Sequence, residues 1–219
     1  MGNGIVRAIK NIYKRQKYCL LYKKYKEFTM IPKEQFIGNL ECIDWHKVPV
    51  GKIVECGVWK GGMIAAIAEL LGKDFEYHLF DSFEGLPSPN ENDGKLAIDW
   101  YNKNGINNCV VDISFAKKAM KKSKIDKVYF HKGWFNETIP NLEINDISVL
   151  RIDSDWYDSV KISLDYLFPK VKLGGILIID DYYAWEGCRK SVNEYFTRNS
   201  LYLLREWNNS KVYYILKNT

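Results

Sequence analysis

The sequence predicts an α/β fold, in which a largely parallel sheet carries helices on both of its faces. From residue 53 onward, short apolar segments alternate with helical stretches, and this alternation is typical of sheets built from strand–helix–strand units. Segments such as ILIID at residues 176–180 are apolar almost throughout, as burial on both faces of a sheet requires. Near the C-terminus, two strand-like runs flank the turn-forming residues Asn208, Asn209 and Ser210, which predicts an antiparallel hairpin at one edge.

The composition fits one compact domain of ordinary charge. The chain has 219 residues, of which 47% are hydrophobic, so it can bury a substantial core. Its net charge of +5 is local, because residues 1–35 hold nine Lys and Arg against two Glu and the remainder is slightly acidic. Nucleic acid is therefore not expected as a partner.

The cysteines and the hydropathy pattern indicate the cellular compartment in which the protein would work. The five cysteines are widely separated and form no C-x-x-C pair, so neither a disulfide framework nor a zinc site is indicated. No apolar run approaches the roughly 20 residues needed to span a bilayer. The basic start also lacks the apolar segment of a signal peptide. We expect a cytoplasmic protein with free thiols.

Residues 1–50 are expected to form a basic helical arm or cap ahead of an α/β domain at residues 51–219. A helix is predicted over residues 5–28. Its apolar face would hold Ile5, Ala8, Ile9, Ile12, Cys19 and Leu20, with Arg7, Lys10, Lys14 and Lys17 pointing away. The arm could pack on the domain or a second subunit, or contact anionic lipid as a peripheral membrane helix. We expect the packed arm, and with it a homo-oligomer.

The elements of the domain follow in order. Strands are expected at residues 53–58, 77–83, 127–133, 147–153, 174–180, 201–207 and 211–217, and helices at 63–72, 113–122, 159–168 and 186–197. Asp158 sits where the third of these helices begins and is expected to cap it. The one long irregular stretch, residues 84–111, is rich in Pro, Asn, Asp and Gly. Because loops of this length are uncommon unless functional, we expect a lid-like loop.

Polar residues follow four of the predicted strands, at the edge where ligands of open parallel sheets bind. The first strand leads into ECGVWKGG at residues 55–62, whose glycines let the backbone turn tightly and approach a ligand at a helix amino end. Asp81 follows the second strand, in a position to accept hydrogen bonds from ribose hydroxyls. Acid pairs follow the fourth and fifth strands: Asp153 with Asp155, and Asp180 with Asp181.

Two details narrow the chemistry of this edge. Trp59 occupies the place of the second glycine of a dinucleotide motif, and Glu55 precedes the first glycine by two positions. That arrangement is more typical of S-adenosylmethionine sites than of dinucleotide sites. Hydride transfer has no use for the carboxylate pairs, whereas a hard divalent cation does. Three acids from two neighbouring strand ends can give Mg²⁺ oxygen ligands and leave positions for water and substrate.

At these positions the chain resembles the macrocin O-methyltransferases, magnesium-dependent enzymes that use S-adenosylmethionine to methylate sugar hydroxyls of natural products. The resemblance covers about residues 29–196. It rests on TMIP at 29–32, VECGVWKGG at 54–62, FDSFEGLP at 80–87, KGWFNETIP at 132–140, LRIDSDWYDS at 150–159 and GGILIIDDY at 174–182. It implies a class I methyltransferase (Rossmann-like) fold, which is a seven-stranded sheet whose last strand is antiparallel.

The resemblance also implies roles for individual residues. Those at the cofactor would be Thr29, Met30, Glu55, Gly57, Gly61, Asp81, Ser82, Gly133, Trp134, Phe135 and Asp153, with Asp81 on the ribose and the turn at 133–135 near the adenine. Asp153, Asp180 and Asp181 resemble the metal ligands, and Asp155 the general base, so that Asp153 and Asp155 are the catalytic pair. Where the family often has Gly and a smaller apolar residue beside this base, the chain has Ser154 and Trp156. This departure concerns the acceptor more than the reaction.

The sequence thus predicts an O-methyltransferase that moves a methyl group from S-adenosylmethionine to a metal-chelated hydroxyl of a sugar, a glycosylated metabolite or a polysaccharide precursor. Two alternatives stay open. The same chemistry could act on a catechol or phenol, since a catechol also chelates Mg²⁺ through adjacent oxygens. The chain could instead be a membrane- or nucleic-acid-binding protein with a vestigial cofactor site. The presence of an acid at every expected position argues against a vestigial site.

Overall fold

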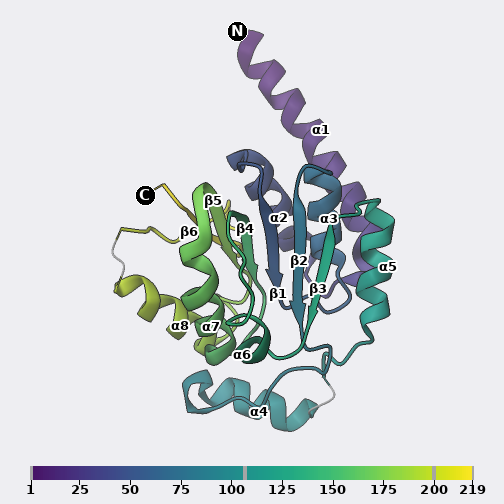
Figure 1. Ribbon diagram of the computed structural model, residues 1–219. Coiled ribbons are helices and arrows are strands. Elements are labelled where there is room, and N and C mark those ends of the chain that lie inside the picture. The colour runs from purple at the N-terminus through teal and green to yellow at the C-terminus, as the bar shows by residue number, and fades with distance from the viewer. Residues whose placement is uncertain (1, 106–107, 199–200, 219) are drawn as a thin grey trace.

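The structure, a computed structural model, describes the backbone of residues 2–105, 108–198 and 201–218, and the side chains from residue 12 onward within these ranges. Its centre is a seven-stranded sheet in the order β3-β2-β1-β4-β5-β7-β6 (Figure 1). Strands β1 to β5 run parallel to one another, and β7 is antiparallel to its neighbours β5 and β6. The strands are β1 Lys52–Cys56, β2 Glu76–Asp81, β3 Val128–Lys132, β4 Ile147–Ile152, β5 Val171–Ile179, β6 Arg205–Glu206 and β7 Tyr213–Leu216.

Helices cover both faces of the sheet, as the alternating pattern predicts (Figure 1). The α-helices are α1 Gly2–Tyr25, α2 Lys33–His46, α3 Gly62–Leu71, α4 Gly94–Asn104, α5 Ile113–Ser123, α6 Phe135–Thr138, α7 Tyr157–Leu167 and α8 Glu186–Thr197, and short 3-10 turns are η1 Lys26–Phe28, η2 Glu91–Asp93 and η3 Phe168–Lys170. Alternate residues along the strands enter two separate apolar clusters: Val149 packs with α1, α2, α3 and α5, whereas Leu150 packs with α7 and α8. This two-sided burial explains why the central strands are apolar throughout.

The N-terminal arm is helical, but its buried face differs from the predicted one. Helix α1 runs along α2 and its first part extends away from the body (Figure 1). The buried residues are Tyr18, Leu21 and Tyr25, whereas Ile12 and Leu20 are 58% and 65% exposed. The prediction was wrong because two tyrosines and Leu21 carry the packing at this i, i+3, i+7 spacing. The predicted positions at residues 5–10 lie outside the described side chains.

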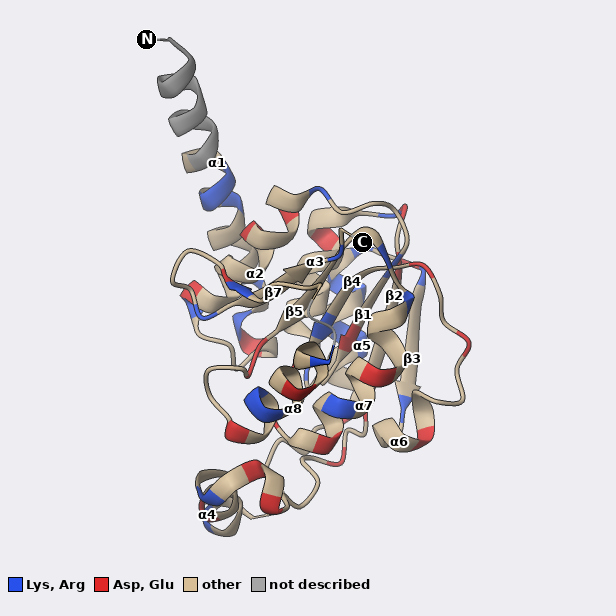
Figure 2. Ribbon diagram, turned by 90° about the vertical axis from the view of Figure 1, so that its left-hand side faces the viewer, with Lys and Arg blue, Asp and Glu red and all other residues tan. Residues whose placement is uncertain are grey.

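Several basic residues of α1 pair with acids of the body. Figure 2 shows α1 leaving the body, with basic residues on its described part. Lys14 pairs with Asp44 at 2.9 Å, and Arg15 pairs with Glu34 and Glu41 on α2. Helix α2 itself was not predicted as a separate element, and its Phe36, Ile37, Leu40 and Ile43 are completely buried in the core of the sheet. The division of the chain at residue 50 stays a prediction.

The stretch at residues 84–111 is less irregular than predicted, because it contains η2 and the 11-residue helix α4. Helix α4 lies beyond the carboxyl ends of the parallel strands (Figure 1). Clustered Asn, Asp and Gly hid this helix in the sequence, since these residues form its ends: Asn90 caps η2 through the Asn92 N–H, and Gly105 follows the last turn of α4. Residues 106 and 107 of the predicted lid lie outside the described residues.

Two further predictions of local structure were wrong. Residues 201–204 are not in a strand, and only Arg205–Glu206 pairs with β7, because Tyr202 packs its ring against Phe168 and Phe196 instead. Asp158 does not cap α7, although it lies in the first turn. Within the described part of the chain, no helix has the length and apolar character needed to cross a membrane.

Candidate active site

The loops after β1, β2, β4 and β5 meet at the carboxyl edge of the sheet and enclose two adjoining pockets. The larger one, of about 370 Å³, is lined by predicted site residues Thr29, Met30, Glu55, Gly57, Asp153, Asp155, Asp180 and Asp181. The smaller one, of about 70 Å³, is lined by Gly57, Asp81, Ser82, Trp134, Phe135 and Asp153. Gly61 and Gly133 line neither pocket. The fold therefore brings most of the predicted residues together, as their positions after the strands predict. Gly57 and Asp153 line both pockets and lie at their boundary.

Position 57 requires a glycine because two backbone segments approach each other closely there. It has φ +87°, and a Cβ at this position would lie 1.6 Å from the Asp153 carbonyl oxygen. No other residue fits there without a backbone shift, because L side chains rarely adopt this φ and the obstacle is main chain. Gly61 also has positive φ, at +78°, and ends the turn into α3. The glycines thus shape the loop whether or not each touches a ligand.

Asp81 fixes the same loop from the neighbouring strand. Its Oδ2 accepts hydrogen bonds from the backbone N–H groups of Val58 and Trp59 at 2.7 and 2.8 Å, and its Oδ1 accepts one from Phe83 at 2.6 Å. The carboxylate also lines the smaller pocket. Asp81 is therefore placed at the pocket expected for the ribose, and it has a structural role there that strand-end reasoning did not predict.

Glu55 is buried at the floor of the larger pocket with one oxygen still free. Its Oε1 accepts a hydrogen bond from Arg151 at 2.8 Å, whereas Oε2 is buried without a partner in the described structure. Burial raises the pKa of Glu55 to about 8, against the opposing charge of Arg151. A buried, unsatisfied carboxylate oxygen that borders a pocket is a suitable acceptor for a cationic ligand group.

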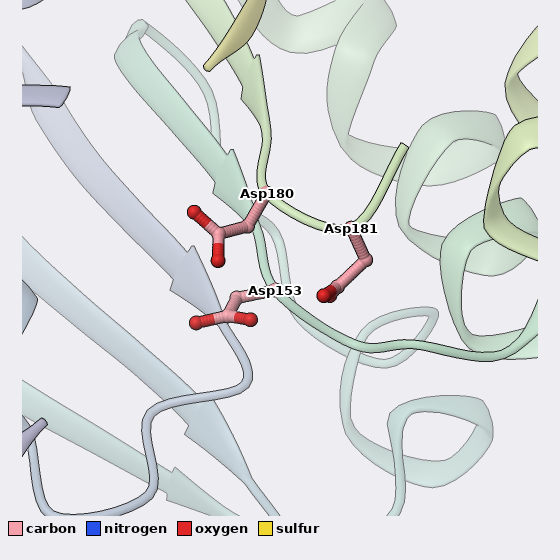
Figure 3. A group of neighbouring side chains, drawn as sticks. All are labelled: Asp153, Asp180 and Asp181. Carbon is pink, nitrogen blue, oxygen red and sulfur yellow. The ribbon is translucent and has the colours of Figure 1, made fainter. Parts of the chain in front are cut away.

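Three carboxylates converge at the ends of β4 and β5. Figure 3 shows Asp153, Asp180 and Asp181 facing a common space, and one oxygen of each lies within 4.8 Å of the others. Burial, opposed by the guanidinium of Arg151, raises the pKa of Asp180 to about 6. Burial also raises the pKa of Asp181, and the charge of Asp155 adds to that effect. A cluster whose members disfavour one another's charge calls for a cation, and these oxygens are the donors that Mg²⁺ prefers.

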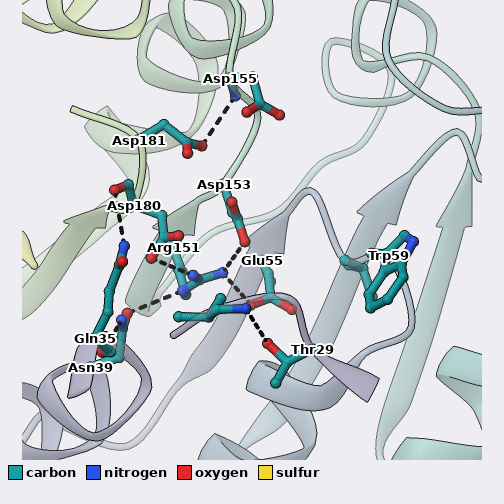
Figure 4. Close-up of polar contacts among 12 residues, drawn as sticks. Thr29, Gln35, Asn39, Glu55, Trp59, Arg151, Asp153, Asp155, Asp180 and Asp181 are labelled. Atoms are coloured by element: carbon teal, nitrogen blue, oxygen red, sulfur yellow. Dashed lines mark hydrogen bonds and ion pairs between the residues drawn. The ribbon is translucent and has the colours of Figure 1, made fainter. Parts of the chain in front are cut away.

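Arg151 lies at the centre of the acid cluster and was missed from the sequence. It is 1% exposed, and its Nη1 donates to Glu55 Oε1 and Asp153 Oδ2 at 2.8 Å each (Figure 4). Its Nη2 forms an ion pair with Asp180 Oδ1 at 2.6 Å, and its Nε donates to Asn39 at 3.1 Å. The signal was available, because a charge in the middle of the buried strand ISVLRI requires partners of opposite charge.

Asp155 lies beside the three carboxylates in a left-handed backbone conformation, with φ +56°. Its N–H donates to Asp181 Oδ2 at 3.2 Å, and it lines the larger pocket. Withdrawal from water and the charge of Asp153 raise its pKa to about 7. Asp155 thus lies close to the cluster, and no cation forms an ion pair with it in the described structure. These features fit a carboxyl group that exchanges a proton, not one that stays ionised.

The outer wall of the larger pocket comes from segments far apart in the sequence. Trp100 of α4 lines it and packs edge-to-face on Trp156 and Trp185, at ring-centroid distances of 6.2 and 5.6 Å. Trp156 itself is only 2% exposed and donates to the Pro87 carbonyl oxygen. Trp156, where the chain departs from the family pattern, therefore reaches the pocket through Trp100 rather than directly.

Comparison with known proteins agrees with this geometry. The model of the macrocin O-methyltransferase (TylF) family matches residues 25–214. Demethyldecarbamoylnovobiocin O-methyltransferase of Streptomyces niveus is 32% identical over 180 aligned positions, and the alignment covers 76% of this chain and 67% of that protein. The 8-demethyl-8-(2,3-dimethoxy-alpha-L-rhamnosyl)-tetracenomycin-C 4'-O-methyltransferase of Streptomyces olivaceus is 32% identical over 153 aligned positions, and the alignment covers 66% of this chain and 58% of that protein.

Among solved structures, the O-methyltransferase NovP is similar with a TM-score of 0.74 at 27% identity, covering 88% of this chain and 83% of that chain. Together with the seven-stranded sheet and its antiparallel last strands, this likeness confirms the expected class I methyltransferase fold. The family model spans most of the chain and the relatives exceed 30% identity. The chain is therefore an O-methyltransferase and belongs to the macrocin O-methyltransferase (TylF) family.

Proposed function

We propose that the protein transfers a methyl group from S-adenosylmethionine to a hydroxyl of a sugar or a glycosylated acceptor, in a reaction that requires Mg²⁺. One observation carries the proposal: the unpartnered oxygen of Glu55 and the acid cluster border the same pocket. A relative whose name includes a rhamnosyl group in its substrate supports the choice of a sugar acceptor.

The cofactor would lie across the boundary of the two pockets. The free Oε2 of Glu55 suits the ammonium group of the methionine part, because it is buried and lacks a partner. Asp81 and Ser82 border the smaller pocket, where the ribose would lie, and Trp134 and Phe135 would flank the adenine. Gly57 lets the main chain approach the cofactor at the boundary.

The acid cluster fits a magnesium ion. Asp153, Asp180 and Asp181 would hold it, since each offers an oxygen to a common space and Mg²⁺ is commonly bound through a few carboxylates with water in the remaining positions. When bound, the ion would supply positive charge that lowers the pKa of an acceptor hydroxyl. The same charge would compensate the three carboxylates, whose mutual repulsion is otherwise offset by Arg151 at Asp153 and Asp180 and by the Asp155 N–H at Asp181.

The residues of the chain then have three tasks. Asp155 accepts the proton of the acceptor hydroxyl as the new C–O bond forms and the bond between methyl carbon and sulfur breaks. The leaving thioether is neutral, so no residue needs to protonate it. Glu55, the Gly57 turn and the outer wall at Trp100 hold oxygen, carbon and sulfur in line, and this positioning is the larger part of the catalysis.

The first prediction tests the reaction and its metal. Protein freed of metal with EDTA, then incubated with S-adenosylmethionine and a panel of glycosides, nucleotide sugars and catechols, should methylate a sugar only after Mg²⁺ is added. The product should gain one methyl group by mass spectrometry. A magnesium-free control and a control without protein accompany each acceptor.

Other outcomes would contradict separate parts of the proposal. Full activity in EDTA would overturn the metal assignment, and methylation of catechols with no sugar modified would move the acceptor to the alternative class. Binding of S-adenosylmethionine without transfer to any member of the panel would contradict the acceptor assignment as a whole.

A further inference from the structure

Each of the three carboxylates in the acid cluster already uses one of its oxygens inside the protein. Asp153 Oδ2 contacts Arg151 Nη1 at 2.8 Å, and Asp180 Oδ1 contacts Arg151 Nη2 at 2.6 Å (Figure 4). Asp181 Oδ2 accepts the N–H of Asp155 at 3.2 Å. One oxygen of each carboxylate is thus engaged, and its other oxygen is the one left for a ligand.

The guanidinium that engages two of these oxygens cannot easily move. Arg151 is 1% exposed, lies on the central strand β4, and is held from its other side by Asn39 at 3.1 Å and by Glu55 at 2.8 Å. A guanidinium stays charged at any physiological pH and presents its donors in a rigid planar fork. The two aspartates therefore meet a fixed partner, not a mobile surface cation.

We infer that Arg151 is a positioning residue that leaves Asp153 and Asp180 one oxygen each for a metal ion and thereby selects Mg²⁺ over Ca²⁺. The inference rests on the metal site of the proposed function. Mg²⁺ takes six ligands at about 2.0–2.1 Å, usually with single carboxylate oxygens and several waters. Ca²⁺ takes six to eight ligands at about 2.3–2.6 Å and often binds both oxygens of one carboxylate. Carboxylates restricted to one oxygen suit the smaller ion.

Charge compensation alone would not have this effect. The two ions carry the same charge, so a guanidinium that only offset the charge of the cluster would alter the affinity for both ions by a similar factor. Freeing a second oxygen on Asp153 and Asp180 instead favours the ion that can use it. The ratio of the two affinities therefore separates positioning from charge balance, and it does not depend on catalytic activity.

The experiment measures that ratio in the full-length protein without cofactor. Mn²⁺ is bound and followed by electron paramagnetic resonance, and Mg²⁺ or Ca²⁺ is titrated to displace it. In Arg151→Met the preference for Mg²⁺ over Ca²⁺ should fall by about tenfold, the lower end of what outer partners of metal ligands contribute. Arg151→Lys keeps the charge but replaces the fork by one nitrogen, so the ratio should shift in the same direction by less.

Glu55→Gln is the matched control. Above pH 8, where Glu55 is ionised, it changes the local charge by one unit, as Arg151→Met does in the opposite sense, and it keeps Arg151 and both aspartates that Arg151 contacts. Its absolute affinities should change and its ratio should equal that of the wild type. Circular dichroism establishes that each variant is folded. If Arg151→Met does not fold, Arg151→Lys decides.

An unchanged ratio in the folded Arg151 variants would overturn the inference and leave the proposed function intact. A ratio that shifts equally in Glu55→Gln would also overturn it, because charge would then be the cause. Failure of the wild-type protein to bind Mn²⁺, Mg²⁺ or Ca²⁺ would overturn the metal site of the proposed function, and the inference with it.

Discussion

Individual site residues could be predicted where they follow a strand, and not where they lie within one. Asp153, Asp180 and Asp181 come after apolar runs, so the rule that ligands bind at strand ends groups them from the amino-acid sequence alone. Arg151 lies inside such a run and was overlooked. Its role depends on Glu55 and Asp180, which are distant in sequence, as well as on the nearby Asp153, and only the fold shows that one guanidinium reaches all three.

Asp155 is the residue for which a role in proton transfer can be tested most directly. Asp155→Asn should lower the single-turnover rate of methyl transfer by about 10²–10⁴-fold, as expected for loss of a general base. Mn²⁺ affinity should change little, because the N–H that holds Asp181 is part of the backbone and remains. Asp158→Asn is the control, since this nearby acid only accepts a hydrogen bond from Asn90 and lines neither pocket of the site. Equal rates in the two variants would remove Asp155 as the base.

Among the elements, the apolar strands of the parallel sheet and most of the helices that cover it were predictable, whereas α2, α4 and the short length of β6 were not. The turn residues at the ends of α4 favour a loop in the sequence, whereas tertiary contacts with α8 and η2 fix the place of the helix. The short β6 was predicted as a long strand because residues 201–204 are apolar, but Tyr202 packs on η3 and α8 instead. Local pattern cannot distinguish burial in a sheet from burial beside it.

Asp93 anchors the segment that carries α4, and this leads to a prediction for the whole segment. Asp93 is 1% exposed; its Oδ1 accepts the Tyr157 N–H at the start of α7, and its Oδ2 accepts the Asn90 N–H. Asp93→Ala leaves both donors without this partner, so the free energy of unfolding should fall by about 1–3 kcal/mol. Trypsin should also cleave faster after Lys95 and Lys103 in the native protein, because the segment is released from α7.

The control for this experiment lies on the same helix. Asp99 is exposed, and no hydrogen bond or ion pair holds its side chain in the described structure. Asp99→Ala should leave both the urea midpoint and the rate of tryptic cleavage close to those of the wild type. Cleavage of Asp93→Ala at the wild-type rate would show that the segment is held by its aromatic contacts at Trp100 instead.

At the scale of the whole molecule, the alternation of strands and helices was sufficient to predict the layers. The sequence pattern did not predict which face of the N-terminal helix packs on the body. The basic arm at residues 1–35 was expected to pack on the domain or a second subunit, with lipid contact as the alternative, and Lys14, Arg15 and Lys24 pair with acids of α2 and α3. Exposed pairs of this kind contribute little to stability, so the tyrosines of α1 account for its attachment. A homo-oligomer or membrane contact through α1 stays a prediction.

The stability of the sheet edge should depend on pH through two stacked histidines. His78 on β2 and His131 on β3 lie 3.0 Å apart between Nδ1 and Nε2, and their hydrogen bond needs an unprotonated acceptor. Burial lowers the pKa of His78 to about 4, and the neighbouring His131 and Lys52 add to the effect; burial lowers the pKa of His131 as well. The carboxylate of Glu76 lies 4.0 Å from His78 Nε2 and does not reverse this direction.

The sign of the effect follows from proton uptake. An unfolded histidine titrates near pH 6.5, so between pH 6.5 and 4 the unfolded chain binds protons that the folded chain does not. Stability is therefore fully present above pH 6.5 and is lost as the pH falls toward 4. For His78 the loss between pH 7 and pH 5 should be about 2 kcal/mol. His78→Gln keeps a hydrogen-bonding side chain but cannot titrate. The His78→Gln variant should be less stable than the wild type at pH 7, and its free energy of unfolding should change less with pH.

Urea denaturation of both proteins at half-unit intervals from pH 4.5 to 7.5 measures this effect. The difference between wild type and His78→Gln is the useful quantity, because the buried acids of the active site titrate in both and cancel. The stability of wild type relative to the variant should shrink as the pH is lowered. A constant difference across this range would show that protonation of His78 does not oppose folding, and that the β2–β3 edge tolerates a charged histidine.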